Sequence, residues 1–350
     1  MLQKLDKRSY SLLDANFGRL NEGLRVLEDI ARFILRDYEM TKKLKEMRHS
    51  LSKESQPFDL PFLNSRGKDI GASLILADEL RRENFVDLVL ANAKRTEESL
   101  RVLEEYFKFL RRKNWLKFQK SRFLLYGYEK EIVSKILRQE KIKKLFPLYL
   151  ILDAKYFIKN PVEILKKVIE GGIKAVQYRD KKNSKRKILE NAFKLKEICQ
   201  KYNVLFLIND YLDIALAVEA DGIHLGEKDL AVKSVRKILP FDKIIGCSVH
   251  NLKEAKKAEK EGTDYLSIGA IYPSLTKEEA ILVKPSLIKE VKNKISLPVI
   301  AIGGLNENNL KEVMKLGVDG VAMARAVLSK PNPKIAVKRI LFKIKRLGQG

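Results

Sequence analysis

The chain has 350 residues, a length that favours two domains over one and allows a sizeable buried core. Its formal net charge of +25 permits binding to nucleic acid or to an acidic membrane, and it also suits anionic small substrates. Because no nucleic-acid motif accompanies the charge, we expect a lysine-rich soluble protein with solvated helix faces. The two cysteines, Cys199 and Cys247, form no CxxC pair and the three histidines are scattered, which argues against a disulfide framework or a zinc site.

The chain also lacks the patterns of a membrane or exported protein. Its first residues, MLQKLDKRSY, contain no apolar segment of the secretory kind. No apolar run approaches the roughly eighteen residues that a membrane span needs. We therefore expect a soluble, cytoplasmic protein with no membrane partner and no nucleic-acid partner.

Residues 1–129 are expected to form a helical domain. Apolar residues recur at three- and four-residue spacing over Leu13–Leu35, Met40–Leu51, Ile70–Leu80 and Phe85–Leu110. Asp14 stands at the expected start of the first long helix, where its carboxylate would cap free backbone N–H groups.

This helical region contains an internal repeat. The sequence ANFGRLNEGLRVLE at residues 15–28 aligns with ANAKRTEESLRVLE at residues 91–104, and both copies end in LRVLE. Two copies are too few for a solenoid, so we expect a duplicated helical hairpin that packs about a pseudo-twofold axis.

Polar residues recur in the repeat at three-residue steps, which an apolar core stripe does not explain. Two interpretations stay open, a structural polar network between equivalent helices and a small-molecule site between them. In a structural network, each arginine would pair with the glutamate of the other copy. A binding pocket would use three residues from each copy, namely Asn16, Arg19, Glu22, Asn92, Arg95 and Glu98.

Residues 130–147 are expected to link two domains. The segment KEIVSKILRQEKIKKLF (130–146) has the spacing of a basic amphipathic helix. A helix on a membrane surface is an alternative, but we expect a connecting helix.

From residue 148 to residue 350, expected strands and amphipathic helices alternate. Eight βα units in about 200 residues indicate an α/β fold, a C-terminal (β/α)8 TIM barrel preceded by the mostly α-helical domain. A doubly wound open sheet is the alternative, and both folds place their chemistry at the C-terminal ends of the strands. The expected strands are 148–153, 174–179, 204–209, 222–226, 243–249, 265–271, 298–304 and 320–325.

Polar groups follow every expected strand after the first. Asp210 and Asp229 come after the third and fourth strands, and two carboxylates without histidine or cysteine favour a hard cation such as Mg²⁺. Each would alternatively cap the helix that follows it. Arg179, Lys181 and Lys277 are the cations that would hold phosphoryl oxygens, and we assign the catalytic role to them.

A second anion site is expected at the last two strands. The IGG turn at 302–304 and the backbone at Ala324 and Arg325 match the phosphate site that such barrels commonly carry. The segment YPSLTK (272–277) adds two hydroxyls and a lysine. These motifs suit a monophosphate at strands seven and eight and a Mg²⁺-bound diphosphate near strands two to five.

With these residues assembled, the second domain resembles the thiamine-phosphate synthase (thiamine-phosphate pyrophosphorylase) family. The resemblance implies a TIM-barrel transferase that joins 4-amino-5-hydroxymethyl-2-methylpyrimidine diphosphate to 4-methyl-5-(2-phosphooxyethyl)thiazole. The products are thiamine phosphate and pyrophosphate. The resemblance covers about residues 148–345 and rests on QYRDK (177–181), LINDYLDIALAVEADGIHLGEKDL (207–230), IGCSVH (245–250), IGAIYPSLTK (268–277), AIGG (301–304) and DGVAMARAV (319–327).

The same resemblance implies roles for individual residues. Asp210 and Asp229 would hold Mg²⁺, while Ser248 and Lys277 would contact the diphosphate. Arg325 stands where the family often has a small residue. The pyrimidine diphosphate would contact Gln177, Tyr178, Arg179, Asp180, Lys181 and Asn209, and the thiazole phosphate would be received by Ser274, Leu275, Thr276, Gly304, Ala324 and Arg325.

The first domain, with its repeats and RGKDIG (66–71), resembles a helical domain often fused ahead of this synthase. That resemblance implies phosphorylation of hydroxymethylpyrimidine phosphate, the preceding step, although no Walker A loop identifies a nucleotide site. A purely structural domain is the alternative. For the whole chain, a basic nucleic-acid-binding protein on a barrel scaffold and another phosphate-binding isomerase or synthase also stay open. The expected partners are small-molecule substrates, and the oligomeric state is left open, with a homo-oligomer among the options.

Overall fold

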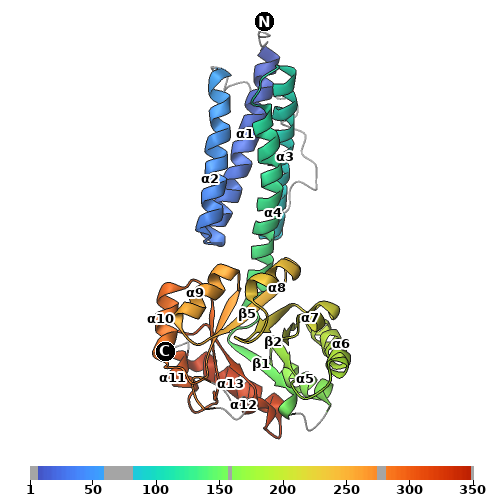
Figure 1. Ribbon diagram of the computed structural model, residues 1–350, viewed down its shortest axis with the longest axis vertical. Helices are drawn as coiled ribbons and strands as arrows, with labels where there is room; N and C mark the ends of the chain where they lie inside the picture. Colours follow the sequence, from blue (N-terminus) through green and yellow to red (C-terminus); the bar gives the residue numbers. More distant parts are fainter. Residues whose placement is uncertain (1–6, 59–81, 157–159, 274–280, 348–350) are drawn as a thin grey trace. The chain divides into compact units, whose positions relative to one another are not determined.

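The computed structural model describes residues 7–58, 82–156, 160–273 and 281–347 (Figure 1). The chain divides into two compact units, Met1–Leu137 and Arg138–Gly350, which we call the helical unit and the barrel unit. The segment 130–147 does not begin a new helix, because residues 130–143 continue helix α4 (Trp115–Lys143). The boundary between the units therefore falls inside that helix.

Four long helices build the helical unit, and they run side by side in Figure 1. They are α1 (Lys7–Asp29), α2 (Tyr38–Ser52), α3 (Phe85–Phe109) and α4, with a π turn at Ile30–Ile34 and a 3-10 turn at Lys53–Phe58. Capping side chains set two of the helix starts, because Asp37 accepts from the Met40 N–H and Asn84 from the Asp87 N–H. The expected helix at Ile70–Leu80 lies outside the described residues.

The prediction that Asp14 caps the first long helix is wrong. Helix α1 already begins at Lys7, so Asp14 lies two turns inside it, where its side chain is buried. One carboxylate oxygen of Asp14 has no hydrogen-bond partner, which is an unfavourable state for a buried polar atom. The extra turns precede the apolar repeat, so the spacing of apolar residues does not predict them.

The internal repeat of the sequence is also present in the structure. Glu28, the last residue of the first copy, is buried in α1. It accepts a hydrogen bond of 2.9 Å from Nε of Arg48 on α2, and Nη2 of the same guanidinium also lies 2.9 Å from the carboxylate. Glu104, the last residue of the second copy, is buried in α3 and binds Arg122 of α4 at 3.1 Å. Each copy thus carries a buried carboxylate neutralised by an arginine of the following helix, as expected for a duplicated hairpin.

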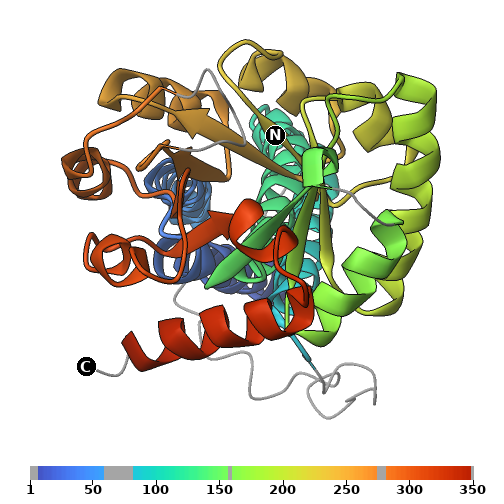
Figure 2. The ribbon, with the colours of Figure 1, turned by 90° about the horizontal axis from the view of Figure 1, so that it is seen from below.

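Eight parallel strands close into a barrel, which confirms the TIM-barrel prediction. Closure is explicit in the register, because Leu148 of the first strand pairs with Val321 of the last, and an open sheet would leave both edges free. Seen end-on in Figure 2, the strands are ringed by helices. The strands are β1 (Leu148–Asp153), β2 (Ala175–Arg179), β3 (Leu205–Asn209), β4 (Gly222–Leu225), β5 (Ile244–Val249), β6 (Tyr265–Ile268), β7 (Val299–Ile302) and β8 (Gly320–Met323).

Helices connect and cover these strands. The long ones carry an apolar stripe that packs on the outside of the barrel, as their three- and four-residue spacing predicts. The helices of the barrel unit, long and short, that follow β1 are α5 (Pro161–Glu170), α6 (Lys185–Lys201), α7 (Leu212–Ala217), α8 (Val232–Ile238), α9 (Leu252–Glu261), α10 (Ser286–Lys294), α11 (Leu310–Met314), α12 (Arg325–Leu328) and α13 (Pro333–Leu347).

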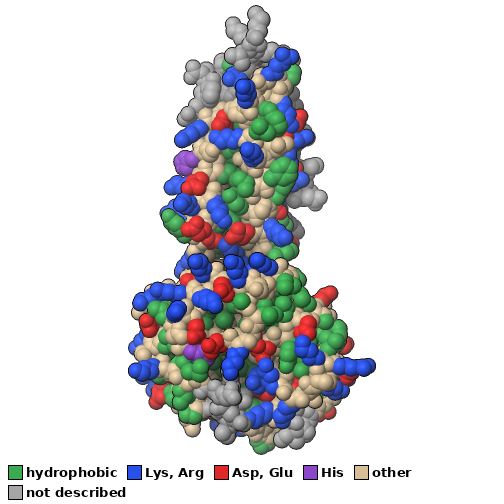
Figure 3. All heavy atoms as spheres, in the orientation of Figure 1, with side chains coloured by type: hydrophobic (Ala, Val, Ile, Leu, Met, Phe, Trp, Pro, Cys, Tyr) green, Lys and Arg blue, Asp and Glu red, His purple; other side chains and the backbone are tan. Residues whose placement is uncertain are grey.

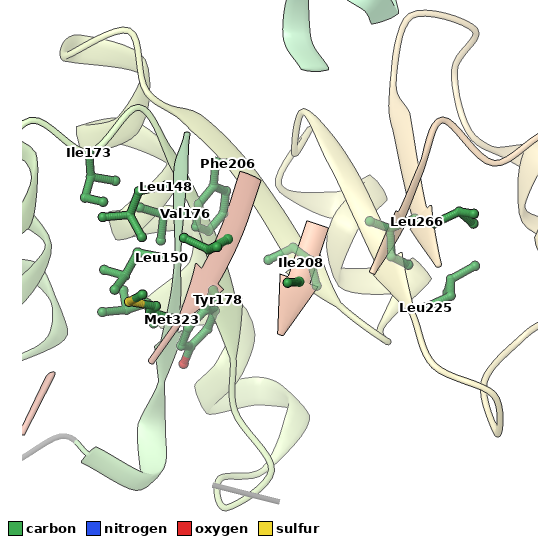
Figure 4. Close-up of a cluster of buried hydrophobic side chains, with 14 of the residues drawn as sticks. Leu148, Leu150, Ile173, Val176, Tyr178, Phe206, Ile208, Leu225, Leu266 and Met323 are labelled. Carbon is green, nitrogen blue, oxygen red and sulfur yellow. The ribbon is translucent and has the colours of Figure 1, made fainter. Parts of the chain in front are cut away.

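Alternate residues of each strand face opposite sides of the barrel wall. Outward residues such as Leu150, Val176 and Tyr178 pack with the surrounding helices in the cluster drawn in Figure 4. Inward residues such as Tyr149 and Tyr265 form a separate cluster inside the barrel. This alternation decides which polar residues can reach a site at the C-terminal ends of the strands.

The N-terminal end of the barrel is closed by apolar and charged contacts. Ile142 and Leu145 join the interior cluster, and Arg138 donates to Asp264, just before β6, at 2.8 Å.

On the face drawn in Figure 3, Lys and Arg side chains are spread over both units and interspersed with Asp and Glu. None of the helices in the described ranges combines the length and the apolar character that a membrane span needs.

Candidate active site

Two aspartates meet at the C-terminal ends of β3 and β4. Asp210 directly follows β3, and its positive φ of 65° turns the chain sharply there. Its backbone N–H donates to the carbonyl of His224 on β4 at 2.9 Å, which ties the turn to the neighbouring strand. Asp229 lies in the loop after β4 and accepts from the Gly226 N–H at 2.7 Å. Neighbouring strands therefore bring the two predicted metal ligands together.

The two carboxyl groups interact directly. Burial, a hydrogen bond with Asp210 and the charge of Asp210 together raise the pKa of Asp229 to about 6. The ammonium group of Lys181, from the loop after β2, forms an ion pair with Asp210 and lies 5.4 Å from the Tyr211 ring centroid. A nearby cation relieves the repulsion between two adjacent carboxylates, and the oxygen-only donors of this pair suit a hard divalent ion as well as a lysine.

In the part of the chain that the structure describes, no three His, Cys, Asp or Glu side chains gather as a metal cluster. Asp210 and Asp229 thus stand as a pair rather than as part of a closed cage. Mg²⁺ typically takes one or two protein carboxylates and fills its other positions with water and phosphate oxygens, so a pair fits this ion.

Arg179 has a buried partner that the sequence analysis did not identify. Its guanidinium donates to Asp153, the last residue of β1, at 2.6 Å. The Asp153 side chain is only 2% exposed, whereas that of Arg179 is 20% exposed. The aspartate therefore anchors the arginine from below and leaves part of the guanidinium open to the site. Polar groups consequently occur at the end of β1 as well.

Gln177 and Asn209 form a buried amide pair. Both face into the barrel, from β2 and β3, and the Gln177 amide donates to the Asn209 side-chain oxygen at 2.5 Å. Gln177 in turn accepts from the Tyr149 hydroxyl. These contacts fix the orientation of both amides at the inner wall of the site.

Ser248, at the end of β5, is held by a histidine. His224 of β4 lies 3.0 Å from the Ser248 hydroxyl through Nε2 and 2.9 Å from the Tyr265 hydroxyl through Nδ1. The three side chains come from three consecutive strands. This histidine looked isolated in the sequence, but it faces the barrel interior together with the predicted site residue.

Two predicted substrate contacts do not face the site. Tyr178 points outward into the cluster of Figure 4, and its hydroxyl contacts Asp180 at 2.9 Å and Asn191 of α6 at 3.3 Å. Asp180 accepts from the backbone N–H groups of Lys182 and Asn183, so it shapes the loop after β2. Although burial raises the pKa of Asp180, its hydrogen bonds with Asn183 and its neighbours lower it overall, as for a structural carboxylate. Both side chains thus have structural partners, and the assignment of Tyr178 and Asp180 as substrate contacts stays a prediction.

The glycine turn after β7 lies against the segment after β6. Gly303 and Gly304 both have positive φ, and a Cβ on Gly304 would come within 2.6 Å of the Pro273 carbonyl oxygen, so only glycine fits. Ala324 immediately precedes α12, whose first turn presents free backbone N–H groups, and the Arg325 side chain is exposed. Ser274, Leu275, Thr276 and Lys277 lie outside the described residues.

Both parts of the chain match families of known proteins. Residues 148–327 match the family model described as thiamine monophosphate synthase, and residues 11–131 match the ThiD2 family. A thiamine-phosphate synthase of Synechocystis sp. is 37% identical over 96% of both chains, and one of Prochlorococcus marinus subsp. pastoris is 34% identical over 95% of both. The chain belongs to the thiamine monophosphate synthase family.

Relatives of the barrel alone are also found. A thiamine-phosphate synthase of Methanobrevibacter smithii is 41% identical over 57% of this chain and 95% of its own. The solved thiamine phosphate pyrophosphorylase of Pyrococcus furiosus is 33% identical, with a TM-score of 0.55, over 59% of this chain and 98% of its own. The resemblance to thiamine-phosphate synthase that the motifs indicate is confirmed. Within this family, the barrel occurs both with and without the helical unit.

The six predicted pocket residues of the helical unit are two asparagines that bond within their own helices and four residues with exposed side chains. Asn16 and Asn92 are equivalent in the repeat, and each donates back to a carbonyl of its own helix, Leu12 at 2.9 Å and Leu88 at 2.8 Å. The arginine and glutamate positions of both copies, Arg19, Glu22, Arg95 and Glu98, are exposed. The same polar residues therefore recur because the helices are equivalent, and the buried charges that recur in both copies are Glu28 and Glu104.

A groove does occur in the helical unit, between α2 and α4, with a volume of about 570 Å³. Three lysines line it, and Lys117 among them binds Glu54 at 2.6 Å. The other lining residues include Tyr128, Ser50 and Ser121. None of the six predicted pocket residues is among those that line this groove. The lysines of the groove are Lys43, Lys117 and Lys120.

Proposed function

We propose that the barrel unit joins 4-amino-5-hydroxymethyl-2-methylpyrimidine diphosphate to 4-methyl-5-(2-phosphooxyethyl)thiazole. The bond from the pyrimidine methylene carbon to the diphosphate oxygen breaks first, and the thiazole ring nitrogen then forms a bond with the methylene carbon. The products are thiamine phosphate and pyrophosphate. The proposal agrees with the family to which the chain belongs and with the activity named for its relatives from Synechocystis and Pyrococcus furiosus.

The observation that carries the proposal is the arrangement of charge around Asp210. Asp210, Asp229 and Lys181 lie together at the strand ends, and Arg179 lies on the neighbouring β1–β2 side, anchored by Asp153. Arginine suits bidentate contact with phosphoryl oxygens and lysine supplies a point charge. In the reaction, these two cations hold the diphosphate and stabilise the negative charge that grows on it as it leaves.

Asp210 and Asp229 are the residues that would hold Mg²⁺, and the ion would supply further positive charge to the diphosphate. The inner wall, Gln177 and Asn209, orients the aminopyrimidine. The thiazole nitrogen is already a nucleophile, so the site needs no strong general base. The electron-rich aminopyrimidine stabilises the methylene cation, and positioning of the thiazole supplies much of the remaining acceleration.

The test uses the purified full chain with both substrates and Mg²⁺, and identifies the products by phosphorus NMR. Formation of thiamine phosphate together with pyrophosphate supports the proposal. Turnover of a different phosphate-bearing substrate, with none of this pair, would instead favour another phosphate-binding synthase or isomerase.

We further propose that the helical unit phosphorylates hydroxymethylpyrimidine phosphate, which would supply the diphosphate used by the barrel. Two observations support it, the match of residues 11–131 to the ThiD2 family and the groove lined by Lys43, Lys117 and Lys120, which suits phosphate groups. A full chain carrying Asp229→Asn, to silence condensation, should convert hydroxymethylpyrimidine phosphate and ATP to the diphosphate.

Lys120→Ala should abolish this conversion. Lys94→Ala serves as the matched control, because Lys94 is an exposed lysine of α3 whose side chain is 70% exposed. Diphosphate formation that survives Lys120→Ala would move the site elsewhere in the unit. No diphosphate with any nucleotide would leave the unit a structural one.

A further inference from the structure

The two cations at the end of β2 differ in the anion that each one binds. The Arg179 guanidinium donates to Asp153 at 2.6 Å, and the other carboxylate oxygen of Asp153 accepts from the Lys155 N–H at 2.8 Å. Asp153 is therefore a structural partner that stays with the arginine. The Lys181 ammonium group instead pairs with Asp210, one of the two predicted metal ligands. A single carboxylate thus has two roles, as the partner of a lysine and as a ligand for a cation.

The two members of the Lys181–Asp210 pair are held differently. The Asp210 side chain is 11% exposed, and its backbone N–H donates to the His224 carbonyl at 2.9 Å, which fixes the residue at the end of β3. The Lys181 side chain is 46% exposed and belongs to the loop after β2. The lysine can move away with little loss of buried surface, whereas the aspartate stays in place.

Tyr211 gives this lysine a second contact. The ammonium groups of Lys181 and Lys185 each lie 5.4 Å from the Tyr211 ring centroid. Lys185 pairs with Asp213 at 2.8 Å, and these two side chains are 64% and 59% exposed. A lysine has a flexible stem, so its ammonium group can leave a carboxylate and remain near the ring. The two lysines are therefore matched in their contact with Tyr211 and differ in the carboxylate that they bind.

A divalent cation and the Lys181 ammonium group compete for Asp210. Two positive charges at one carboxylate repel each other, so an ion held by Asp210 and Asp229 displaces the lysine, and the Lys181–Asp210 ion pair is lost. A diphosphate changes this balance, because its oxygens accept hydrogen bonds from the displaced ammonium group and also serve as ligands of the ion. Each of the two ligands therefore makes the binding of the other more favourable.

We propose that Lys181 is a mobile counterion of Asp210, which transfers to the diphosphate and so makes the divalent cation and the diphosphate bind cooperatively. This inference rests on the function proposed above. Without diphosphate, the lysine neutralises Asp210 and weakens the affinity of the site for a divalent ion. With diphosphate, the ammonium group moves to the phosphoryl oxygens, beside the anchored guanidinium of Arg179. The site is thereby completed only when the substrate that needs the ion is present.

The first measurement is the affinity of the full chain for Mn²⁺ without diphosphate, followed by the relaxation of water protons. Lys181→Met should bind Mn²⁺ about fivefold more tightly than the unaltered chain, the scale of a partly exposed ion pair. Lys185→Met is the matched control and should leave the affinity unchanged, because this lysine pairs with Asp213. Asp210→Asn should abolish the binding, which assigns the measured ion to this site.

Three results of this measurement would overturn the proposal. They are an unchanged or weaker affinity in Lys181→Met, an equal gain in Lys185→Met, and Mn²⁺ binding that survives Asp210→Asn. An equal gain in the control would mean that any lost positive charge near Tyr211 has the same effect.

The second measurement is the affinity for labelled pyrophosphate, determined by equilibrium dialysis with and without saturating Mn²⁺. Mn²⁺ should tighten pyrophosphate binding about fivefold more in the unaltered chain than in Lys181→Met, because only the unaltered chain has a lysine to release. The complex of Mn²⁺ with pyrophosphate in solution is the same for both proteins and cancels in this comparison. Equal tightening in the two proteins would contradict the proposal.

Neither measurement involves the thiazole phosphate or turnover, so the two proposals fail separately. Condensation by a chain that fails both binding tests would overturn the role of Lys181 alone. The expected binding results in a chain that makes no thiamine phosphate would support the role of Lys181 and overturn only the proposed function.

Discussion

The guanidinium of Arg179 is bonded to the buried carboxylate of Asp153 at 2.6 Å, across the first two strands of the barrel. The bond fixes an arginine at the rim of the site while its partner stays out of reach of solvent. A cation held in a fixed position stabilises a departing diphosphate well, because the protein does not have to reorganise as negative charge develops on the diphosphate.

Asp153→Asn should therefore weaken substrate binding rather than folding. Without the anionic anchor, Arg179 loses its fixed position, and we expect KM for the pyrimidine diphosphate to rise about tenfold. Steady-state kinetics check this, with Glu170→Gln as the control, since Glu170 forms an exposed ion pair with Lys334 at 2.7 Å. An unchanged KM in Asp153→Asn would mean that Arg179 does not depend on this anchor.

Asp210→Asn and Asp229→Asn should each lower turnover at least about a hundredfold, the scale of a lost electrostatic stabiliser. The melting temperature should barely change, because asparagine can still accept the hydrogen bond that Asp229 takes from Gly226. Turnover of the unaltered chain should require Mg²⁺ or Mn²⁺. Full activity in excess chelator would contradict the assignment of a metal to this pair.

Most of the barrel could be predicted from the sequence because each strand is a short apolar run that ends in polar residues. Part of the site could not be predicted from these motifs, because a motif alone does not show which side of a strand each residue faces. The motif QYRDK predicts one binding segment, but neighbouring strand residues face opposite sides. Gln177 and Arg179 therefore point inward, while Tyr178 packs against helices. Tyr149 shares its strand and its parity with Asp153, and applying that parity to β1 would have identified both.

The helical unit was harder to predict for a different reason. A helix has no strict two-sided alternation, so the repeated polar residues at positions such as Arg19 and Arg95 gave no sign of their exposure. The glutamates that end LRVLE looked like the polar edge of an apolar stripe. Their burial depends on Arg48 and Arg122, which come from later helices and cannot be paired with them by spacing alone.

The close approach of α1 and α3 gives a prediction about stability. A Cβ on Gly23 would lie 2.2 Å from the Thr96 hydroxyl and 3.0 Å from the Asn92 carbonyl oxygen. Gly23→Ala should therefore destabilise the helical unit by about 1–3 kcal/mol through overpacking. Gly127→Ala, at a glycine of α4 with nothing within 4 Å, should stabilise it by about 0.5–1 kcal/mol. The fluorescence of Trp115, the single tryptophan, follows unfolding of this unit. Equal changes in the two variants would contradict the close packing.

Glu97 should make the stability of the helical unit depend on pH. Burial, followed by a hydrogen bond with Glu129 and its charge, raises the pKa of Glu97 from 4.5 to about 7. The folded state then binds a proton on Glu97 more tightly than the unfolded state does. The contribution of Glu97 to folding stability is therefore fully present below pH 4.5, and it is lost as the pH rises through about 7.

Denaturant unfolding followed by Trp115 at pH 5 and pH 8 tests this dependence. Glu97→Gln should remove the loss of stability between the two pH values. The neighbouring Glu98→Gln should keep it, because the Glu98 side chain is 63% exposed. A pH dependence that persists in Glu97→Gln would assign it to another group.

The central claim, condensation of the two phosphorylated precursors at the C-terminal ends of the strands, is tested most directly by following pyrophosphate release. The full chain is given the pyrimidine diphosphate and Mg²⁺, first alone and then with the thiazole phosphate, and both products are quantified. Pyrophosphate should appear rapidly only when both substrates are present, in equal amount to thiamine phosphate, and Asp210→Asn should suppress both products together. Pyrophosphate release at the same rate without the thiazole, or no thiamine phosphate from the two substrates, would contradict the account.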